Sequence, residues 1–121
     1  MLAKNNRIRT RFEFDKVRKF GRQYKSRFFY MYAVRVQEFN GVWDIGEETR
    51  VGFIVSNKFD KSAVVRNKVK RRFRECLRAN FAQVSRGWWI VFHPRKLSLE
   101  AEYAEICADI AKVLQELPVS R

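Results

Sequence analysis

The sequence predicts a single α/β domain, and three observations lead to this prediction. Three segments space their apolar residues as one face of a helix does, and three others are rich in aromatic and β-branched residues. A length of 121 residues suits one hydrophobic core, and 46% apolar residues argue against disorder throughout. No linker, repeat or low-complexity stretch divides the sequence, so we treat residues 1–121 as one domain, with residues 1–9 as a flexible basic arm.

The first helix is predicted to begin at "TRFE", residues 10–13, because Thr10 and Glu13 have the spacing of a capping box. Phe14 and Val17 share its apolar stripe. The helix should run to about residue 20, and we expect Gly21 to end it with a positive φ.

Three strands are predicted next along the chain, although a helix separates the last two. The stretch "RFFYMYAVRV", residues 27–36, is apolar on both faces, which indicates a strand covered on both sides or lined for a ligand. A short extra strand is expected around residues 23–25, and residues 37–49 form a long loop. "RVGFIVS", residues 50–56, and "GWWIVFHP", residues 87–94, are the other strands, and Trp88 and Trp89 should point to opposite faces.

Two further helices are predicted from apolar stripes. The helix between the last two strands follows Ser62 as N-cap and ends near residue 81, with a stripe of Val65, Val69, Phe73, Cys76 and Leu77. The final helix is expected to be capped by Ser98 and stopped by Pro118. Cys76 and Cys107 lie on these stripes, and we interpret them as buried free thiols, with a disulfide as the alternative.

The charge of the protein is strongly positive and unevenly placed. Formal net charge is +13, from 26 Lys plus Arg against 13 Asp plus Glu. Arg66, Lys70, Arg74 and Arg78 follow one another at intervals of four, so that like charges meet on one side of the middle helix. Such a row destabilises a helix until an anion binds to it, which indicates a polyanionic partner, above all nucleic acid.

These patterns also have other interpretations. The basic face could be merely solvated; a membrane surface fits less well, because the apolar stripe of this helix is needed to cover the sheet. Five aromatic residues could line a groove on which bases stack, or could simply fill the core: Phe14, Phe20, Tyr30, Tyr32 and Phe53.

No catalytic pattern is visible in the sequence. The one histidine, His93, has no Cys, Ser or second His near it in sequence that would suggest a nucleophile or a zinc site, and we interpret it as structural. Neither a glycine-rich phosphate loop nor a secretory signal is present, and the longest apolar run is too short to span a membrane.

"RVGFIVSNK" followed by "AVVRNKVKRRFRE" resembles the protein subunit of bacterial ribonuclease P. "RFEFDKVRKFG" and "WWIVFHPRKLSLEAEYAEI" extend the resemblance over about residues 7–117. The resemblance implies a compact two-layer α/β sandwich in the order α-β-β-β-α-β-α, with a mostly antiparallel sheet and a left-handed βαβ crossover. The sequence departs from the family pattern at Arg18, where an aromatic residue is frequent, and at His93-Pro94, where Arg-Pro is common.

The resemblance also implies a function: the protein assists an RNA subunit that removes the 5′ leader of precursor tRNA with Mg²⁺, bound mainly by that RNA. The residues that match the helix facing the catalytic RNA are Arg66, Asn67, Lys68, Lys70, Arg71 and Arg74. Those assigned to leader binding are Phe14, Val17, Tyr32, Phe53 and Lys58. We expect a cytoplasmic monomer in a 1:1 complex with RNA. A ribosomal or other structural RNA-binding protein is the alternative.

Overall fold

A computed structural model describes residues 7–8, 10–35, 49–81, 84 and 87–117. Within these ranges the chain forms α1 (Arg11–Phe20), β1 (Arg22–Lys25), β2 (Phe29–Arg35), β3 (Arg50–Phe53), α2 (Ala63–Asn80), β4 (Trp88–Pro94), a 3₁₀ helix η4 (Lys96–Glu100) and α3 (Tyr103–Gln115). The predicted α/β fold and its element order are confirmed. The expected loop over residues 37–49 lies outside the described residues except for Thr49.

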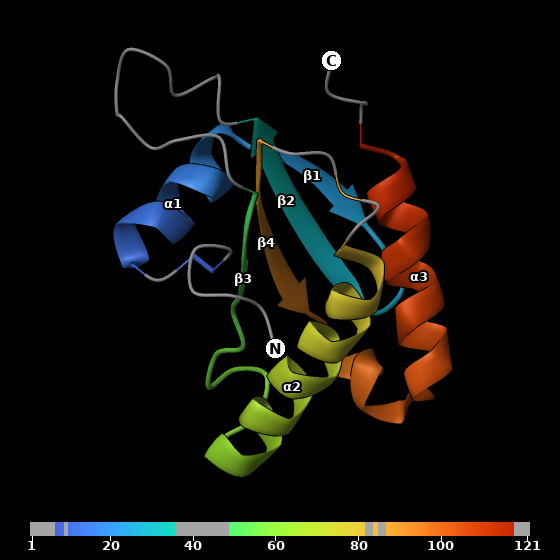
Figure 1. Ribbon diagram of the computed structural model, residues 1–121. Helices are drawn as coiled ribbons and strands as arrows, with labels where there is room; N and C mark the ends of the chain where they lie inside the picture. Colours follow the sequence, from blue (N-terminus) through green and yellow to red (C-terminus); the bar gives the residue numbers. More distant parts are fainter. Residues whose placement is uncertain (1–6, 9, 36–48, 82–83, 85–86, 118–121) are drawn as a thin grey trace.

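The sheet has the strand order β1-β2-β4-β3. Strands β1, β2 and β4 pair antiparallel, and β3 pairs parallel with β4, so that α2 is the crossover between two adjacent parallel strands. The left-handed sense of this crossover stays a prediction. Figure 1 shows α1 on one side of the sheet and α2 with α3 on the other. Helix α1 thus adds a third layer to the two that we expected.

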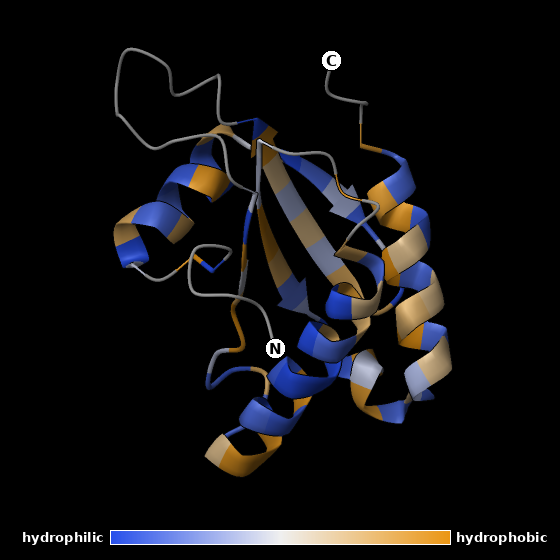
Figure 2. Cartoon of the chain, in the orientation of Figure 1, coloured by the Kyte–Doolittle hydropathy of each residue, from blue (hydrophilic) through white to orange (hydrophobic). Residues whose placement is uncertain are grey.

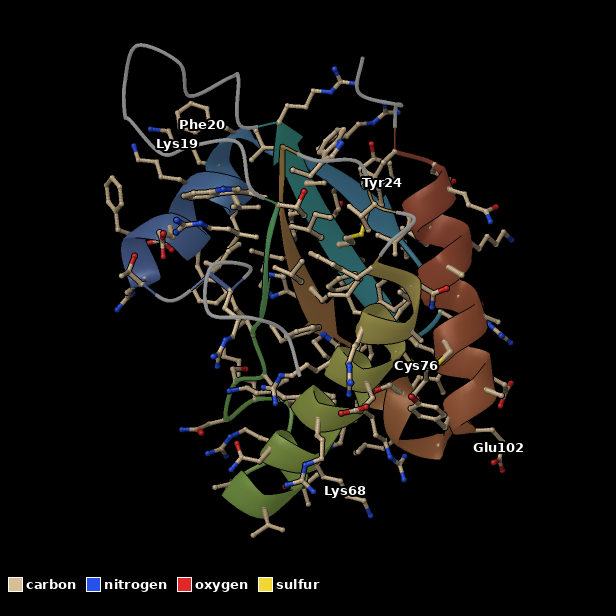
Figure 3. The ribbon with its side chains drawn as sticks, viewed as in Figure 1. Lys19, Phe20, Tyr24, Lys68, Cys76 and Glu102 are labelled. Carbon is tan, nitrogen blue, oxygen red and sulfur yellow. A yellow bond between two sulfur atoms is a disulfide. The ribbon has the colours of Figure 1, made fainter. Side chains whose placement is uncertain are left out.

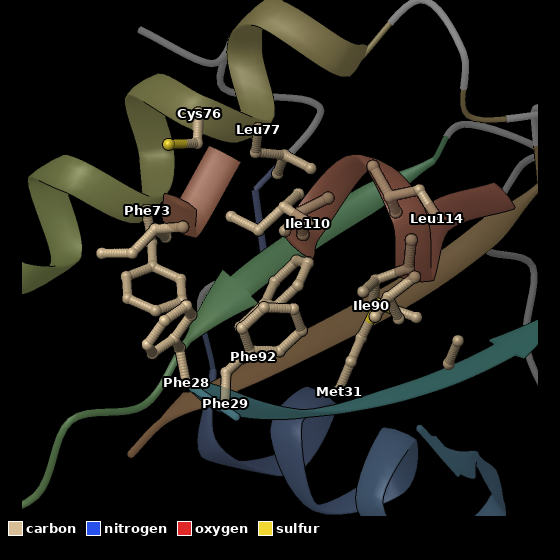
Figure 4. Packing of buried hydrophobic residues seen from close by; sticks show 14 of the residues in the cluster. Phe28, Phe29, Met31, Phe73, Cys76, Leu77, Ile90, Phe92, Ile110 and Leu114 are labelled. Carbon is tan, nitrogen blue, oxygen red and sulfur yellow. The ribbon is translucent and has the colours of Figure 1, made fainter. Parts of the chain in front are cut away.

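Two hydrophobic clusters lie on the two faces of the sheet, as the doubly apolar pattern of residues 27–36 predicts. The larger cluster joins the sheet to α2 and α3 through residues such as Phe29, Phe73 and Phe92 (Figure 4). The smaller one lies under α1 and consists of Ile8, Val17, Val34, Trp89 and Val91. Figure 2 shows that the residues along the outer side of α2, away from the larger cluster, are mainly hydrophilic.

The two helix starts that capping predicts are confirmed, and the third is wrong. Thr10 and Glu13 form the capping box of α1, and Ser62 accepts a hydrogen bond from the Val65 amide at the start of α2. Ser98 does not cap the final helix: it is buried within η4, and Glu102 caps α3 instead. Ser98 therefore lies in a short 3₁₀ helix that precedes α3, and not at the start of α3.

Gly21 ends α1, but not by the expected left-handed conformation. Its backbone is extended, with φ −79° and ψ 153°, and its N–H donates to the Val17 carbonyl. A Cβ atom at this position would lie 2.3 Å from that carbonyl oxygen and 3.2 Å from the backbone of Ala33. A side chain here would collide first with the Val17 carbonyl in the last turn of α1 and then crowd the backbone of β2, so this lack of space, and not the φ angle, explains the glycine.

The cysteines form a disulfide between Cys76 of α2 and Cys107 of α3, 31 residues apart, so the interpretation as free thiols is wrong. Both residues lie on the facing stripes of two packed helices, and this packing brings the two sulfur atoms together. A cross-link that closes a loop of this kind stabilises a fold by about 2–4 kcal/mol.

The start of the described chain is part of the fold. The Ile8 amide donates to the Val51 carbonyl at 2.9 Å, and Arg7 forms a parallel bridge with Val51. The buried side chain of Ile8 belongs to the cluster under α1. The expected flexible arm is therefore wrong for residues 7–8, while residues 1–6 and 9 lie outside the described residues.

Candidate RNA interface

Helix α2 presents its polar side to solvent while its apolar stripe packs on the sheet. Val69, Phe73, Cys76 and Leu77 are buried, as predicted. The residues on the opposite side are exposed or half-buried, and we call them the α2 basic face: Arg66, Asn67, Lys68, Lys70, Arg71 and Arg74. Figure 3 shows Lys68 pointing outward from the helix. The structure thus brings the predicted RNA-facing residues together on one surface.

Carboxylates neutralise little of this surface. In the described part of the chain, the ion pair on α2 joins Arg78 to Glu75 at 4.0 Å, outside the basic face. Arg66 is held by backbone oxygens instead, because its Nη1 donates to the Asp60 and Lys61 carbonyls at 2.8 and 2.9 Å. The first turn of α2 also contains no acidic residue to offset the helix dipole. The surface is suited to phosphates.

Lys58 lies beside the start of α2 rather than with the aromatic residues predicted to bind the leader. It lines an open hollow together with Asn57, Phe59, Asp60, Lys61, Arg66 and Lys96. Four of these seven side chains are cationic and one is acidic. The hollow therefore extends the α2 basic face past the helix N-terminus, where free amides add to the attraction for anions.

Two of the predicted leader-binding residues meet on the opposite side of the sheet. Phe14 and Tyr32 both pack, partly buried, against the cluster under α1, and Val17 lies fully buried within it. Tyr32 accepts a hydrogen bond from Gln23 Nε2 at 2.9 Å. Its ring meets the His93 ring edge-to-face, with centroids 5.3 Å apart. We call Phe14, Arg18, Tyr32 and His93 the α1-side site.

Phe53 does not join the groove that we expected it to share with Phe14 and Tyr32. It stacks on Phe92 at a centroid distance of 5.6 Å, on the face that α2 and α3 cover. Alternation along β3 explains the difference, since the neighbouring Gly52 is the residue that faces α1. A Cβ atom on Gly52 would come within 2.4 Å of the Phe14 ring.

Glu13 fixes the position of α1 over the sheet, a role that sequence reasoning missed. One of its carboxylate oxygens accepts from the Thr10 amide at 3.0 Å, and the other accepts from Arg50 Nη1 at 2.9 Å. The same side chain therefore caps α1 and bonds it to β3. The capping pattern was visible in the sequence, but nothing there pointed to Arg50 as the second partner.

His93 belongs to the α1-side site, although the sequence alone suggested a structural residue. Register places it opposite Tyr30 on the neighbouring strand β2. Burial, and secondly the charge of Arg18, lower the pKa of His93 below its usual 6.5. Its Nε2 atom is buried and has no hydrogen-bond partner among the described residues. The lowered pKa favours the neutral imidazole at neutral pH, and the exposed part of its ring is suited to stack on a base.

The lowered pKa of His93 predicts a pH-dependent stability. The unfolded chain binds a proton near pH 6.5 while the folded protein resists it, so the free energy of unfolding is greatest above that pH and falls below it. Between about pH 7.5 and about pH 5.5 the wild type should lose more stability than His93→Gln does. Urea denaturation at both pH values measures this difference, and equal losses would contradict it.

The structure and its surfaces define a class of protein. A sheet with helices on both faces, one of them carrying a basic face that forms no ion pair with a carboxylate of the described residues, defines a compact α/β protein that binds nucleic acid. None of the helices in the described ranges combines the length and apolar character that crossing a membrane requires.

Comparison with known proteins identifies the family. The family model described as Ribonuclease P matches residues 2–118. The ribonuclease P protein component of Symbiobacterium thermophilum is 31% identical over 94% of this chain and 92% of its own length. That of Cyanothece sp. is 30% identical over 98% and 97%. The solved ribonuclease P protein of Thermotoga maritima superimposes with a TM-score of 0.76 at 29% identity, covering 93% of this chain and 97% of that one.

The chain belongs to the bacterial ribonuclease P protein family. It is the protein subunit of an RNA-based endoribonuclease, with an RNA partner and a role in tRNA processing. The alternative of a ribosomal or other structural RNA-binding protein is thereby set aside.

Proposed function

We propose that the α2 basic face contacts the RNA subunit of ribonuclease P, and that the α1-side site holds the 5′ leader of precursor tRNA. One protein would bind one RNA, in the cytoplasm where precursor tRNA is made. The RNA subunit would cut the substrate, and the protein would position it.

The observation that carries this proposal is the separation of two unlike surfaces by the sheet. The α2 basic face offers guanidinium and ammonium groups, which bind phosphates of any sequence. The α1-side site offers two aromatic rings and a half-buried imidazole, which suit unpaired bases. A leader is single-stranded, whereas a catalytic RNA presents a folded, phosphate-rich surface. The α2 basic face therefore suits the folded RNA subunit, and the α1-side site suits the single-stranded leader.

Mg²⁺ is part of the proposal as an ion held mainly by the RNA subunit, where it would activate the attacking water. The described residues contain no group of three or more His, Cys, Asp or Glu side chains that could hold a metal ion. The part that we propose for the protein is to bring cationic side chains close to the RNA.

The leader assignment predicts that Tyr32→Ala weakens binding of precursor tRNA but spares mature tRNA. Loss of one stacked base costs about 1–3 kcal/mol, which is at least a fivefold loss of affinity. The measurement is the affinity of the reconstituted holoenzyme for the two RNAs. Phe53→Ala is the matched control, because Phe53 lies on the other face of the sheet. An equal loss for both RNAs in Tyr32→Ala would contradict a leader site.

Reconstitution tests the proposal as a whole. Protein plus a bacterial ribonuclease P RNA should cleave precursor tRNA to a mature 5′ end at lower Mg²⁺ than the RNA alone. Protein offered the same substrate with Mg²⁺ but without the RNA should leave it intact. Cleavage by the protein alone would place the chemistry on the protein and overturn the division of labour proposed here.

A further inference from the structure

We propose that the ion pair between Glu13 and Arg50 sets how well the protein distinguishes leader-bearing precursor tRNA from mature tRNA. Neither residue belongs to the α1-side site or to the α2 basic face. They act as positioning residues, because they hold α1, which carries part of the α1-side site, at a fixed place over the sheet. The inference rests on the proposed leader site and adds the interaction that keeps its two parts together.

The α1-side site is divided between two parts of the fold that this ion pair joins. Helix α1 supplies Phe14 and Arg18, and the sheet supplies Tyr32 and His93. A base can contact both aromatic rings only if α1 stays at the right distance from β2. Glu13 directly precedes Phe14 in the helix, so a displacement of Glu13 moves the Phe14 ring as well.

Apolar packing holds α1 less firmly than it holds α2. Val17 is the buried side chain of α1, whereas α2 buries four side chains: Val69, Phe73, Cys76 and Leu77. A disulfide also joins α2 to α3, while α1 is the only helix of the described residues on its side of the sheet (Figure 1). A helix that buries so little apolar surface depends more on its polar contacts for its position.

The ion pair is short and shielded from solvent. Glu13 Oε2 lies 2.9 Å from Arg50 Nη1, and the two side chains are 16% and 29% exposed, respectively. The other oxygen of Glu13 accepts from the Thr10 amide, which restrains the carboxylate. The Arg50 guanidinium lies 5.3 Å from the ring centroid of Trp89, in the cluster under α1. A charge-assisted bond at such a site is stronger than a fully exposed salt bridge.

The fit between α1 and β3 leaves little room for movement. Arg50 and Gly52 are two residues apart on β3, so both face α1. A Cβ atom on Gly52 would lie 2.4 Å from the Phe14 ring, so this ring already lies close to the strand. A small shift of α1 would therefore change the space between Phe14 and Tyr32.

Glu13→Gln separates the two roles of the Glu13 side chain. Glutamine at this position of a helix still forms a capping box, so the bond to the Thr10 amide can remain. Its neutral amide binds a guanidinium more weakly than a carboxylate does. Thr10→Ala is the matched control, because it removes the hydroxyl that accepts from the Glu13 amide at 3.1 Å and leaves the ion pair in place.

The test is the affinity of the reconstituted holoenzyme for leader-bearing and mature tRNA. Glu13→Gln should weaken binding of the precursor about fivefold, the effect of one lost base stack, and leave binding of mature tRNA unchanged. The cleavage rate at saturating holoenzyme should also stay unchanged, since the proposed chemistry lies on the RNA subunit. Thr10→Ala should bind both RNAs like the wild type. Urea denaturation verifies that each variant is folded under the assay conditions.

Variants of Arg50 test whether it acts through Glu13 or contacts RNA directly. Arg50→Gln should reduce the preference for precursor as Glu13→Gln does, and Arg50→Lys, which keeps a cation, should retain more of it. Combining Glu13→Gln with Arg50→Gln should cost no more than either change alone, because all three variants lose the same interaction. Additive losses would mean that Arg50 contacts RNA directly, and would overturn the positioning role.

Other outcomes separate this inference from the leader site itself. If Glu13→Gln keeps the wild-type preference while Tyr32→Ala loses it, the leader site stands and the positioning role is wrong. An equal loss in Thr10→Ala would tie the effect to the stability of α1, and an equal loss for both RNAs would remove the link to the leader; either result overturns the inference. If Tyr32→Ala keeps the preference, the leader site fails and this inference fails with it.

Discussion

Lys70→Ala combined with Arg74→Ala should weaken assembly with the ribonuclease P RNA by about tenfold for each phosphate that the variant no longer binds, since hydrogen bonds to charged groups are worth about 1.5 kcal/mol. The logarithmic salt slope should also fall by about 0.7–0.9 for each such phosphate. Both residues lie half-buried on the α2 basic face, one turn apart. Arg66 is less suitable for this test, because its removal would also release two loop carbonyls.

The same double variant should not destabilise the isolated protein. Like charges one turn apart cost about 0.2–0.5 kcal/mol, so their removal should leave the free energy of unfolding unchanged or slightly higher. The affinity for RNA would then fall while the free energy of unfolding stays the same or rises, so unfolding of the variant could not explain its weaker binding. Lys112→Ala, an exposed cation on α3, is the control for net charge alone. Unchanged affinity and salt slope in the double variant would refute the placement of the RNA on α2.

Phe73→Ala should lower the free energy of unfolding by about 3–5 kcal/mol, the usual cost of removing a buried phenylalanine. The Phe73 ring is fully buried and contacts Phe29 edge-to-face at 5.8 Å and Phe92 at 6.5 Å. These contacts hold α2 against the sheet, and Figure 4 shows Phe73 within the larger cluster. Urea denaturation measures the loss.

Val64→Ala is the matched control for this prediction. It lies on the same helix, but its side chain is 77% exposed, so its removal should change the stability by less than about 0.5 kcal/mol. A loss below about 1 kcal/mol in Phe73→Ala would mean that α2 is held mainly by other interactions, of which the disulfide to α3 is the strongest candidate.

Local patterns predicted the fold well, and their limits are physical. The stripe through Val69 and Phe73 fixed the buried side of α2, and therefore fixed which side is basic. A periodic pattern reports which residues share a face, but not what approaches that face. The need for glycine at position 21 depends on what approaches it, which is the Val17 carbonyl of α1 and, less closely, the Ala33 backbone of β2. The pairing of Cys76 with Cys107 has the same origin.

The candidate site was predictable where it depends on one element, and less so where it depends on several. All six residues of the α2 basic face come from one helix, and one periodicity places them together. The α1-side site draws on a helix and two strands, so the register of the sheet decides its membership. The register between β2 and β4 places His93 next to Tyr32. Alternation along β3 places Phe53 on the face of the sheet that α2 and α3 cover.

The bridge between Arg7 and Val51 has a consequence for self-association. Strand β3 stands at one border of the sheet, and the Ile8 amide occupies the Val51 carbonyl there. The other border, β1, begins with Arg22 and ends with Lys25. Unpaired borders of sheets invite other chains to add strands, which leads to aggregates. In this protein the edge strand β3 is partly paired by residues 7–8 of the same chain. The other edge strand, β1, carries cations that repel a second copy. We therefore expect that the protein does not form fibres through its sheet edges at high concentration.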